Sequence, residues 1–279
     1  MKLTNAVKRK LIQIAAFGFT NAHLGNFKSG SLYKGSWKQF CAPGLNCYSC
    51  PAASFACPIG ALQAVGGSME FQFSFYVVGF LLAVGILFGR VVCGFLCPFG
   101  LLQELLYKIP FPKRKLPKAC RFIKYGILII FVILLPIIAT DYMGMGKPAF
   151  CQFICPAGTL EGGIPLLLTR PKLREVIGSL FSLKMCILLL TLLGCMSVCR
   201  FFCKAMCPLG AIYGLLNKIS IYHLEVDAGK CIGCGKCAKA CQMDVDPVKH
   251  PDSAECIRCG ACRDACPTQA IRLGFKKKP

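Results

Sequence analysis

The sequence predicts an all-α membrane protein with four transmembrane helices in two parallel repeats, followed by a small α+β domain. Three observations lead to this fold class. Of the 279 residues, 55% are hydrophobic and only 12 are acidic, which is unusual for a soluble domain. Four apolar segments approach the length needed to cross a bilayer. The 22 cysteines recur in matching motifs along the chain. We expect a membrane domain over residues 1–220 and the second domain over residues 221–279.

The predicted spans are residues 11–24, 71–87, 122–139 and 180–198. The first is short and follows a basic N-terminus, so a cleaved signal peptide is the alternative. We favour a retained helix, because its loss would remove the match between the two halves. Each half then has a helix, a cysteine-rich loop, a second helix and a cysteine motif, so the repeats are related by an axis along the membrane normal.

Basic residues predict the orientation of the chain and its surface partner. Residues 108–124 hold seven basic residues and no acidic one, which is typical of a cytoplasmic loop. We therefore expect a multi-pass protein of the cytoplasmic membrane with both termini inside. The net charge is +21, but the basic residues lie beside apolar segments. This favours contact with membrane lipid and argues against nucleic-acid binding.

A Cys-Pro-x-Gly core occurs four times along the chain. The four copies begin at Cys57, Cys97, Cys155 and Cys207. In three copies another cysteine lies four residues earlier, at Cys93, Cys151 and Cys203. The proline suits the first position of a new helix, and the free amides there favour an anion. An iron–sulfur cluster on thiolates is such an anion, so the motif predicts 4Fe–4S ligation.

The two copies that follow the second and fourth spans predict one site at the inner membrane face. They supply Cys93, Cys97, Cys203 and Cys207 from the two halves. Four thiolates are what one 4Fe–4S cluster requires. The alternative is that these are buried, chemically inert cysteines that only fill space.

The expected outer loops hold more cysteines than one cluster needs. They are Cys41, Cys47, Cys50, Cys57, Cys151 and Cys155. Symmetry favours Cys57, Cys151 and Cys155 with one of the first three as ligands of an outer 4Fe–4S cluster. A second assignment uses the first four of the six alone. Disulfides are a further alternative if the exterior is oxidising.

The C-terminal domain carries two cysteine runs that resemble a two-cluster bacterial ferredoxin. The first run has Cys231, Cys234, Cys237 and Cys241, and the second has Cys256, Cys259, Cys262 and Cys266. The resemblance implies that the fourth cysteine of each run ligates the other cluster. One 4Fe–4S cluster would then take Cys231, Cys234, Cys237 and Cys266, and the other Cys256, Cys259, Cys262 and Cys241. Structural zinc or disulfides are the alternatives.

Four more cysteines lie in or near the spans: Cys120, Cys186, Cys195 and Cys199. Small, polarizable cysteines pack well between helices, and packing is our default interpretation. The alternative is an intramembrane relay, because inner and outer clusters would be separated by a hydrocarbon layer about 30 Å thick.

Together, residues 70–275 resemble the membrane polyferredoxins. This family includes the quinol-oxidising subunit of periplasmic nitrate reductase systems, nitrous oxide reductase maturation and electron-donor proteins, and cytochrome oxidase assembly ferredoxins. The resemblance implies an integral membrane carrier that passes single electrons between cytosolic redox proteins and a quinone or an extracytoplasmic reductase. The cysteine-rich outer loops depart from those relatives, which speaks against a simple quinol-dehydrogenase role.

Two other functions remain open at the level of sequence. The chain could be an assembly factor that reduces a metal for a respiratory metalloenzyme, or a membrane redox sensor. No nucleophile–base pattern, P-loop or dinucleotide-binding motif stands out. We therefore expect an electron-transfer subunit of an oxidoreductase system, with no catalytic residues of its own.

Overall fold

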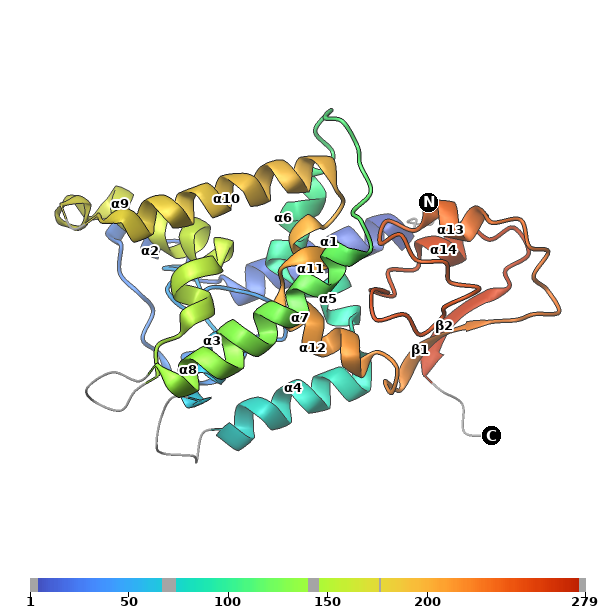
Figure 1. Ribbon diagram of the computed structural model, residues 1–279, viewed down its shortest axis with the longest axis horizontal. Coiled ribbons are helices and arrows are strands. Elements are labelled where there is room, and N and C mark those ends of the chain that lie inside the picture. The colour runs from blue at the N-terminus through green and yellow to red at the C-terminus, as the bar shows by residue number, and fades with distance from the viewer. Residues whose placement is uncertain (1–4, 67–73, 140–145, 176, 276–279) are drawn as a thin grey trace.

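The computed structural model describes residues 5–66, 74–139, 146–175 and 177–275. Figure 1 shows an elongated molecule with the C-terminal part at one end, where β1, β2, α13 and α14 lie. Helices α4 and α10 run along opposite sides of the remainder, and the short helices α5, α11 and α12 lie between them. The cysteine motifs belong to these central helices and to the loops beside them.

The N-terminal half begins with one longer helix and continues through loops and short helices. Its elements are α1 (Asn5–Thr20), α2 (Asn26–Ser29), η1 (Ser36–Gln39), α3 (Pro58–Gly66), α4 (Ser74–Phe88), α5 (Val91–Phe95) and α6 (Pro98–Leu106). Three of the predicted helix starts are confirmed, because α3, α6 and α12 (Pro208–Leu216) each begin at the proline of a Cys-Pro-x-Gly core.

The second half contains the two longest apolar helices. One is assembled from η3 (Ala119–Phe122), α7 (Ile123–Ile127), η4 (Leu128–Leu134) and α8 (Leu135–Ile138). The π-helical stretch η4 precedes Pro136, which cannot donate to the carbonyl four residues earlier. After η5 (Phe150–Ile154), η6 (Gly158–Gly163), α9 (Ile164–Thr169) and η7 (Pro171–Arg174), α10 (Ser179–Ser197) is continuous, and α11 (Phe201–Ala205) follows it.

The prediction of four transmembrane helices in two repeats is wrong. Within the described part of the chain, two helices are long and apolar enough to cross a membrane, Ala119–Ile138 and Ser179–Ser197. Counted over the described residues, α4 has 15 residues and α1 has 16, whereas a span needs about 20. The first three residues of the predicted span 71–87 lie outside the described part of the chain.

Polar side chains of α1 explain why the first apolar segment is not a span. Gln13 is buried, and its Nε2 donates to the carbonyl of Gly94 at 2.9 Å. Arg9 is also buried, and its guanidinium donates to Glu104 on α6. The helix therefore lies against α5 and α6, with Gln13 Nε2 and the Arg9 guanidinium bonded to these helices. The parallel repeat of whole membrane spans is lost with it.

The C-terminal part is built around a two-stranded sheet. Strand β1 (Tyr222–Val226) pairs antiparallel with β2 (Ile271–Phe275), with Tyr222 opposite Phe275. The short helices α13 (Lys236–Ala240) and α14 (Ala261–Asp264) lie within the two cysteine runs, each just before the last cysteine of its run. Leu224 and Ile271 form a small core with cysteines of both runs.

The main core contains five of the motif cysteines: Cys57, Cys93, Cys97, Cys155 and Cys207. Phe99 and Phe202 pack edge to face inside it, with ring centroids 5.0 Å apart. The same core extends into the C-terminal part through Met243, Val245 and Ile257. Cysteine motifs that we expected at opposite membrane faces therefore share one core.

Candidate iron–sulfur sites

Four cysteines, which we call the central group, lie where α5 and α6 meet α11 and α12. They are Cys93, Cys97, Cys203 and Cys207, and all are buried. Burial, followed by the neighbouring Cys203 and Cys93 thiols, raises the pKa of Cys97 to about 12. The pKa of Cys207 is raised well above its usual value by burial and then by the other three thiols. The structure thus brings together the four cysteines that the two halves were expected to share.

Two arginines cross between the halves beside the central group. Arg90 and Arg200 each stand three residues before the first cysteine of their own motif. Arg90 Nη2 donates to the carbonyl of Cys203 at 3.1 Å, and Arg200 Nη1 donates to the carbonyl of Cys93 at 2.5 Å. Both side chains are fully buried. Each arginine therefore holds the cysteine backbone of the opposite motif.

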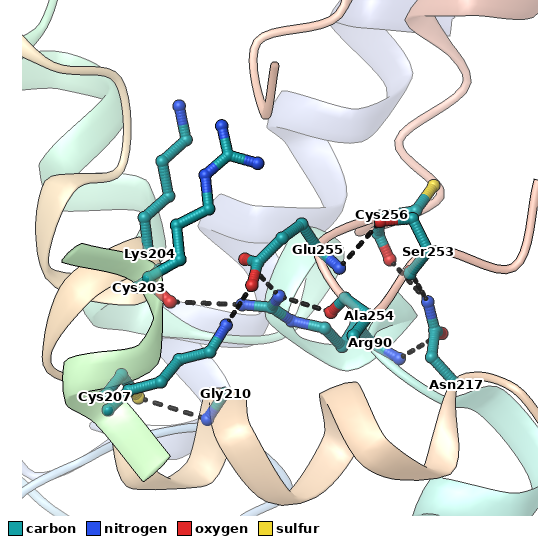
Figure 2. A network of polar contacts seen from close by, with 12 residues as sticks. Arg90, Cys203, Lys204, Cys207, Gly210, Asn217, Ser253, Ala254, Glu255 and Cys256 are labelled. Atoms are coloured by element: carbon teal, nitrogen blue, oxygen red, sulfur yellow. Dashed lines mark hydrogen bonds and ion pairs between the residues drawn. The ribbon is translucent and has the colours of Figure 1, made fainter. Parts of the chain in front are cut away.

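Buried glutamates balance the charge of these arginines. Glu255 accepts from Arg90 Nη1 at 2.9 Å, as Figure 2 shows. It also accepts from Lys124. Glu104 accepts from Arg200 Nη2 at 2.6 Å, and from Arg9 and Lys10 on α1. Burial would raise the pKa of Glu104, but Arg200 and then Arg9 lower it to about 2. Ionised pairs of this kind are costly to break once buried.

The network around Arg90 joins the central group to the C-terminal part. Arg90 Nη1 also donates to the carbonyl of Ala254 at 2.6 Å. Asn217, the C-cap residue of α12, donates to the carbonyls of Ser253 at 2.7 Å and Cys256 at 3.0 Å, as Figure 2 shows. The segment that leads into the second cysteine run is therefore fastened directly against the helices of the central group.

A second set, the loop group, consists of Cys47, Cys57, Cys151 and Cys155. Burial, then the Cys151, Cys47 and Cys57 thiols, raise the pKa of Cys155. Burial, then Cys57, raise the pKa of Cys151 to about 12. A methyl group placed on Gly158 would lie 3.9 Å from Cys47 Sγ, and one on Gly60 would lie 3.9 Å from Cys151 Sγ. Cys47 Sγ thus faces the helical turn that follows Cys155, and Cys151 Sγ faces the turn that follows Cys57.

Of the first three cysteines, Cys47 is the one whose thiol lies beside Cys151 and Cys155. The structure places Cys47 among them, and the backbone N–H of Cys47 donates to Glu161 at 2.8 Å. Cys41 interacts with Cys57, and burial and that thiol raise its pKa to about 11. Cys50 packs beside Cys47, with its Sγ 4.0 Å from Asn21 Oδ1. These two cysteines lie at the edge of the group.

The C-terminal cysteines form two sets that exchange their fourth members. The first tail group, Cys231, Cys234, Cys237 and Cys266, lines a single cavity of about 210 Å³. The second tail group consists of Cys241, Cys256, Cys259 and Cys262. Burial and then the charges of Cys256, Cys259 and Cys241 raise the pKa of Cys262 to about 12. This is the crossed arrangement that the resemblance to a bacterial ferredoxin implies.

The four remaining cysteines lie outside these groups. Cys195 Sγ lies 3.6 Å from Gln103 Oε1, and Cys199 Sγ lies 3.8 Å from Gln242 Oε1. Cys120 packs against a small core beside α11, and Cys186 is exposed on α10. Their places fit packing and hydrogen bonding better than a fifth cluster.

The donor sets suit 4Fe–4S clusters better than single metal ions. In the described part of the chain, no three His, Cys, Asp or Glu side chains are close enough to hold one ion. In a 4Fe–4S cluster each thiolate binds a different iron, so the sulfurs surround a larger body. All 22 cysteines are free thiols. Burial raises the pKa of every thiol in the loop group, and iron binding would displace the protons of these thiols.

Comparison with known proteins supports this assignment. Sequences of a family described as a 4Fe-4S binding domain match residues 70–119, 125–170 and 180–222. A second 4Fe-4S binding domain family matches residues 224–245 and 250–272. The chain belongs to the polyferredoxins. It is an iron–sulfur protein that binds 4Fe–4S clusters.

Some relatives of this polyferredoxin carry ferredoxin-type or electron-transport names, and others are uncharacterized. The methylamine utilization ferredoxin-type protein MauN of Methylobacillus flagellatus is 27% identical over 66% of this chain and 60% of its own length. The putative electron transport protein YccM of Escherichia coli is 24% identical over 57% of this chain and 43% of its own. An uncharacterized protein of Methanocaldococcus jannaschii is 30% identical over 59% of this chain and 63% of its own. The matched region thus spans less than two thirds of each relative, and no solved structure matches.

The arginine and glutamate contacts of this polyferredoxin were not foreseen from its sequence. Arg90 and Arg200 do occupy the same position before matching motifs, which is a signal that sequence inspection could have used. Their glutamates offer no such signal. Glu104 follows its motif closely, whereas Glu255 comes from the C-terminal part.

Proposed function

We propose that this polyferredoxin conducts single electrons through four 4Fe–4S clusters arranged in a row at a membrane. The first and second tail groups, the central group and the loop group each hold one cluster, in that order. The clusters supply reversible one-electron transfer, and the protein supplies their order, spacing and insulation. Soluble redox proteins exchange electrons at the tail, and a quinone or an extracytoplasmic protein exchanges them at the loop group.

The continuity of the four groups carries this proposal. Leu45 O lies 4.0 Å from Cys97 Sγ in the central group. Cys47 of the loop group follows two residues later, a reach of at most about 7 Å along the chain. Tyr213 on α12 donates to the carbonyl of Pro43 at 3.1 Å, so it joins a helix of the central group to the loop that contains Cys41 and Cys47. No membrane thickness separates these groups, so no relay site is needed between them.

The step from the central group to the second tail group is equally short. Asn217 donates to the carbonyl of Cys256 itself, at 3.0 Å. Gly94 next to Cys93 approaches the carbonyl of Ile257 so closely that an added methyl would lie 2.8 Å from it. The two tail groups are in turn linked by α13 and α14, each of which lies between cysteines of both groups.

The far ends of the row differ in exposure. In the first tail group Cys234 is exposed, and the neighbouring Ile232 is 68% exposed. An accessible end of this kind suits transient docking of a soluble redox protein. The loop group is enclosed, because Cys57 and Cys155 are buried.

Two features support a membrane location and a lipid-soluble electron carrier. Only 28% of the residues in the most apolar window of Ala119–Ile138, and 17% in that of Ser179–Ser197, are buried inside the protein. Lipid would cover these apolar surfaces at less cost than water. In addition, α1 and α4 border an apolar cavity of about 450 Å³ lined in part by Cys41, Pro43 and Leu96. Its lining includes Leu96, next to Cys97 of the central group, and Cys41 at the edge of the loop group, which suits a quinone site.

The loop group favours this function over a redox sensor. A sensor needs only clusters that exchange electrons with partners in one compartment. A protein that conducts electrons needs a second cluster, at the other end of the row, where electrons leave or enter. The enclosed loop group, placed beyond the central group as seen from the tail, provides the site for that cluster.

Anaerobic purification of the full chain tests the proposal. We expect about sixteen irons per chain, four for each cluster, and several overlapping EPR signals during a redox titration. Cys97→Ala and Cys207→Ala should each remove the same signal, because the two halves share the central group. About eight irons in the unmodified chain, or different signals lost in the two variants, would refute the four-cluster arrangement.

A further inference from the structure

One position recurs in all four Cys-Pro-x-Gly motifs and is always polar. Six residues after the motif cysteine stand Gln63, Gln103, Glu161 and Tyr213. Each lies more than one turn into the helical stretch that the motif begins. From this position in the helix, the side chain extends toward a segment from the other half of the molecule.

Gln103 on α6 contacts a sulfur of the central group. Its Nε2 lies 3.1 Å from Cys203 Sγ and 3.3 Å from the carbonyl of Phe99. Its Oε1 accepts from the backbone N–H of Cys203 at 3.4 Å and from the thiol of Cys195 at 3.6 Å. The side chain is fully buried.

Gln63 on α3 repeats this geometry in the loop group. Its Nε2 lies 3.3 Å from Cys151 Sγ and 3.1 Å from the carbonyl of Ile59. Its Oε1 accepts from the backbone N–H of Phe150 at 2.8 Å. Gln63 is also fully buried. In both groups a glutamine therefore faces the first cysteine of the opposite motif.

Backbone contacts determine which end of each amide faces the sulfur. The backbone carbonyl four residues before each glutamine can only accept a hydrogen bond, and the backbone N–H near the cysteine can only donate one. If the side-chain amide were flipped, its oxygen would face the carbonyl oxygen and its NH₂ would face the backbone N–H, and neither buried group could form its hydrogen bond. Each glutamine must therefore direct an N–H toward its sulfur.

We propose that Gln63 and Gln103 are positioning residues that raise the reduction potentials of the loop and central clusters by donating to one ligating sulfur each. The inference rests on the proposed function, in which Cys151 and Cys203 are ligands. Reduction adds negative charge to a cluster and its sulfurs, so a fixed donor stabilises the reduced form more than the oxidised form. Hydrogen bonds to the sulfurs are one of the protein's main means of setting such potentials.

The other two residues at this position act differently. Glu161 accepts from the N–H of Cys47 at 2.8 Å, and Tyr213 donates to the carbonyl of Pro43 at 3.1 Å. Both hold the loop that contains Cys41 and Cys47, and neither contact involves a sulfur. Each membrane-domain cluster thus receives one glutamine donor, always from the motif that is earlier in sequence.

Substitution of one glutamine at a time tests the proposal, with the other cluster as an internal control. Gln103→Leu removes the donor and keeps an apolar side chain of similar size. At a fixed ambient potential we expect the oxidised-to-reduced ratio of the central cluster to rise about tenfold, the effect of one such hydrogen bond. For a one-electron couple this is a midpoint about 59 mV lower. The loop cluster should keep its potential, and Gln63→Leu should give the reverse pattern.

Gln103→Glu provides the second variant, because a carboxylate keeps the acceptor for Cys203 N–H and replaces the donor. Its central midpoint should fall below that of Gln103→Leu. Wild-type iron with an unchanged midpoint in both variants would overturn the tuning role and leave the proposed function intact. Loss of the central cluster in both variants would also overturn it, since Gln103 would then serve assembly. Absence of the central or loop signal from the unmodified protein would instead refute the proposed function.

Discussion

At the scale of single residues, the two halves are joined by reciprocal contacts around the cysteines. Arg90 and Arg200 each hold the carbonyl of the other motif's first cysteine, and each is neutralised by a buried glutamate. Fixed positive charges beside a thiolate-bound cluster favour its more negative, reduced state. The site therefore combines charge compensation with rigid backbone positions, which limits the rearrangement that accompanies electron transfer.

The selection of Cys47 over its neighbours gives a prediction at this scale. Cys47→Ser should lose about four irons per chain and the loop-cluster signal, because the remaining three thiolates cannot complete a 4Fe–4S site. Cys50→Ser is the matched control, since Cys50 lies in the same loop but at the edge of the group. Iron analysis and EPR of both variants provide the measurement. Equal iron in the Cys47→Ser and unmodified proteins would contradict the assignment.

The sequence pattern showed which cysteines belong to the repeated motifs. It did not show which of the other cysteines in the same loop would join them. The crossed pairing in the tail could be inferred from the resemblance alone, because the spacing of both runs is specific. Cys41, Cys47 and Cys50 have no such spacing, and only the path of their loop brings Cys47 to Cys151 and Cys155. That path depends on contacts such as the one between Cys47 N–H and Glu161, which are 114 positions apart.

At the scale of elements, the short helices that begin at a motif proline position the cysteines of the central and loop groups. These starts were predictable, because proline at the first helical position needs no hydrogen-bond partner. The number of membrane spans was not predictable from apolar length alone. The partners of Gln13 and Arg9 are Gly94 and Glu104, and nothing in the local sequence of α1 indicates that these polar side chains are satisfied by protein.

The contact between α5 and the C-terminal part gives a prediction for these elements. Gly94→Ala would place a methyl group 2.8 Å from the carbonyl oxygen of Ile257. Overpacking against backbone typically costs about 1–3 kcal/mol, and here it would push the second tail group away from the central group. We expect a lower thermal unfolding midpoint together with slower reduction of the central cluster from the tail.

Gly126→Ala is the control for this substitution. Gly126 lies in α7, and a methyl group there would have nothing within 4 Å. Alanine also favours helix over glycine by up to about 1 kcal/mol, so the variant should be as stable as the unmodified protein or slightly more stable. Equal unfolding midpoints for the two variants would show that the approach of Gly94 to Ile257 tolerates a methyl group.

At the scale of the whole molecule, the four cysteine groups follow one another along its long axis. In Figure 1 the tail groups lie at the end with α13 and α14, and the helices of the central group lie in the middle. The loop group lies beyond it, around α3 and the segments that follow Cys151. This order could not be read from the sequence, where the loop group comes partly before and partly between the two central motifs.

Interruption of the row at its middle tests this order. Cys97→Ser combined with Cys207→Ser removes two of the four central thiolates and leaves the tail and loop groups intact. A soluble reduced redox protein, which is too large to reach the buried loop group, should then still reduce the tail clusters at the normal rate. The loop cluster should remain oxidised over the time in which it is reduced in the unmodified protein. Rapid freezing followed by EPR separates the two steps.

A small, membrane-permeant reductant serves as the control for this interruption, because it bypasses the row. It should reduce the loop cluster equally fast in the variant and in the unmodified protein. Normal reduction of the loop cluster by the soluble protein in the variant would mean that electrons enter at the loop group directly. In that case the central group would be a side branch, and the tail would not be the entrance. We expect electron transfer to the loop cluster to stop in the variant, because the central group lies between the tail and the loop group. It contacts the second tail group through Asn217 and approaches the loop group through Leu45.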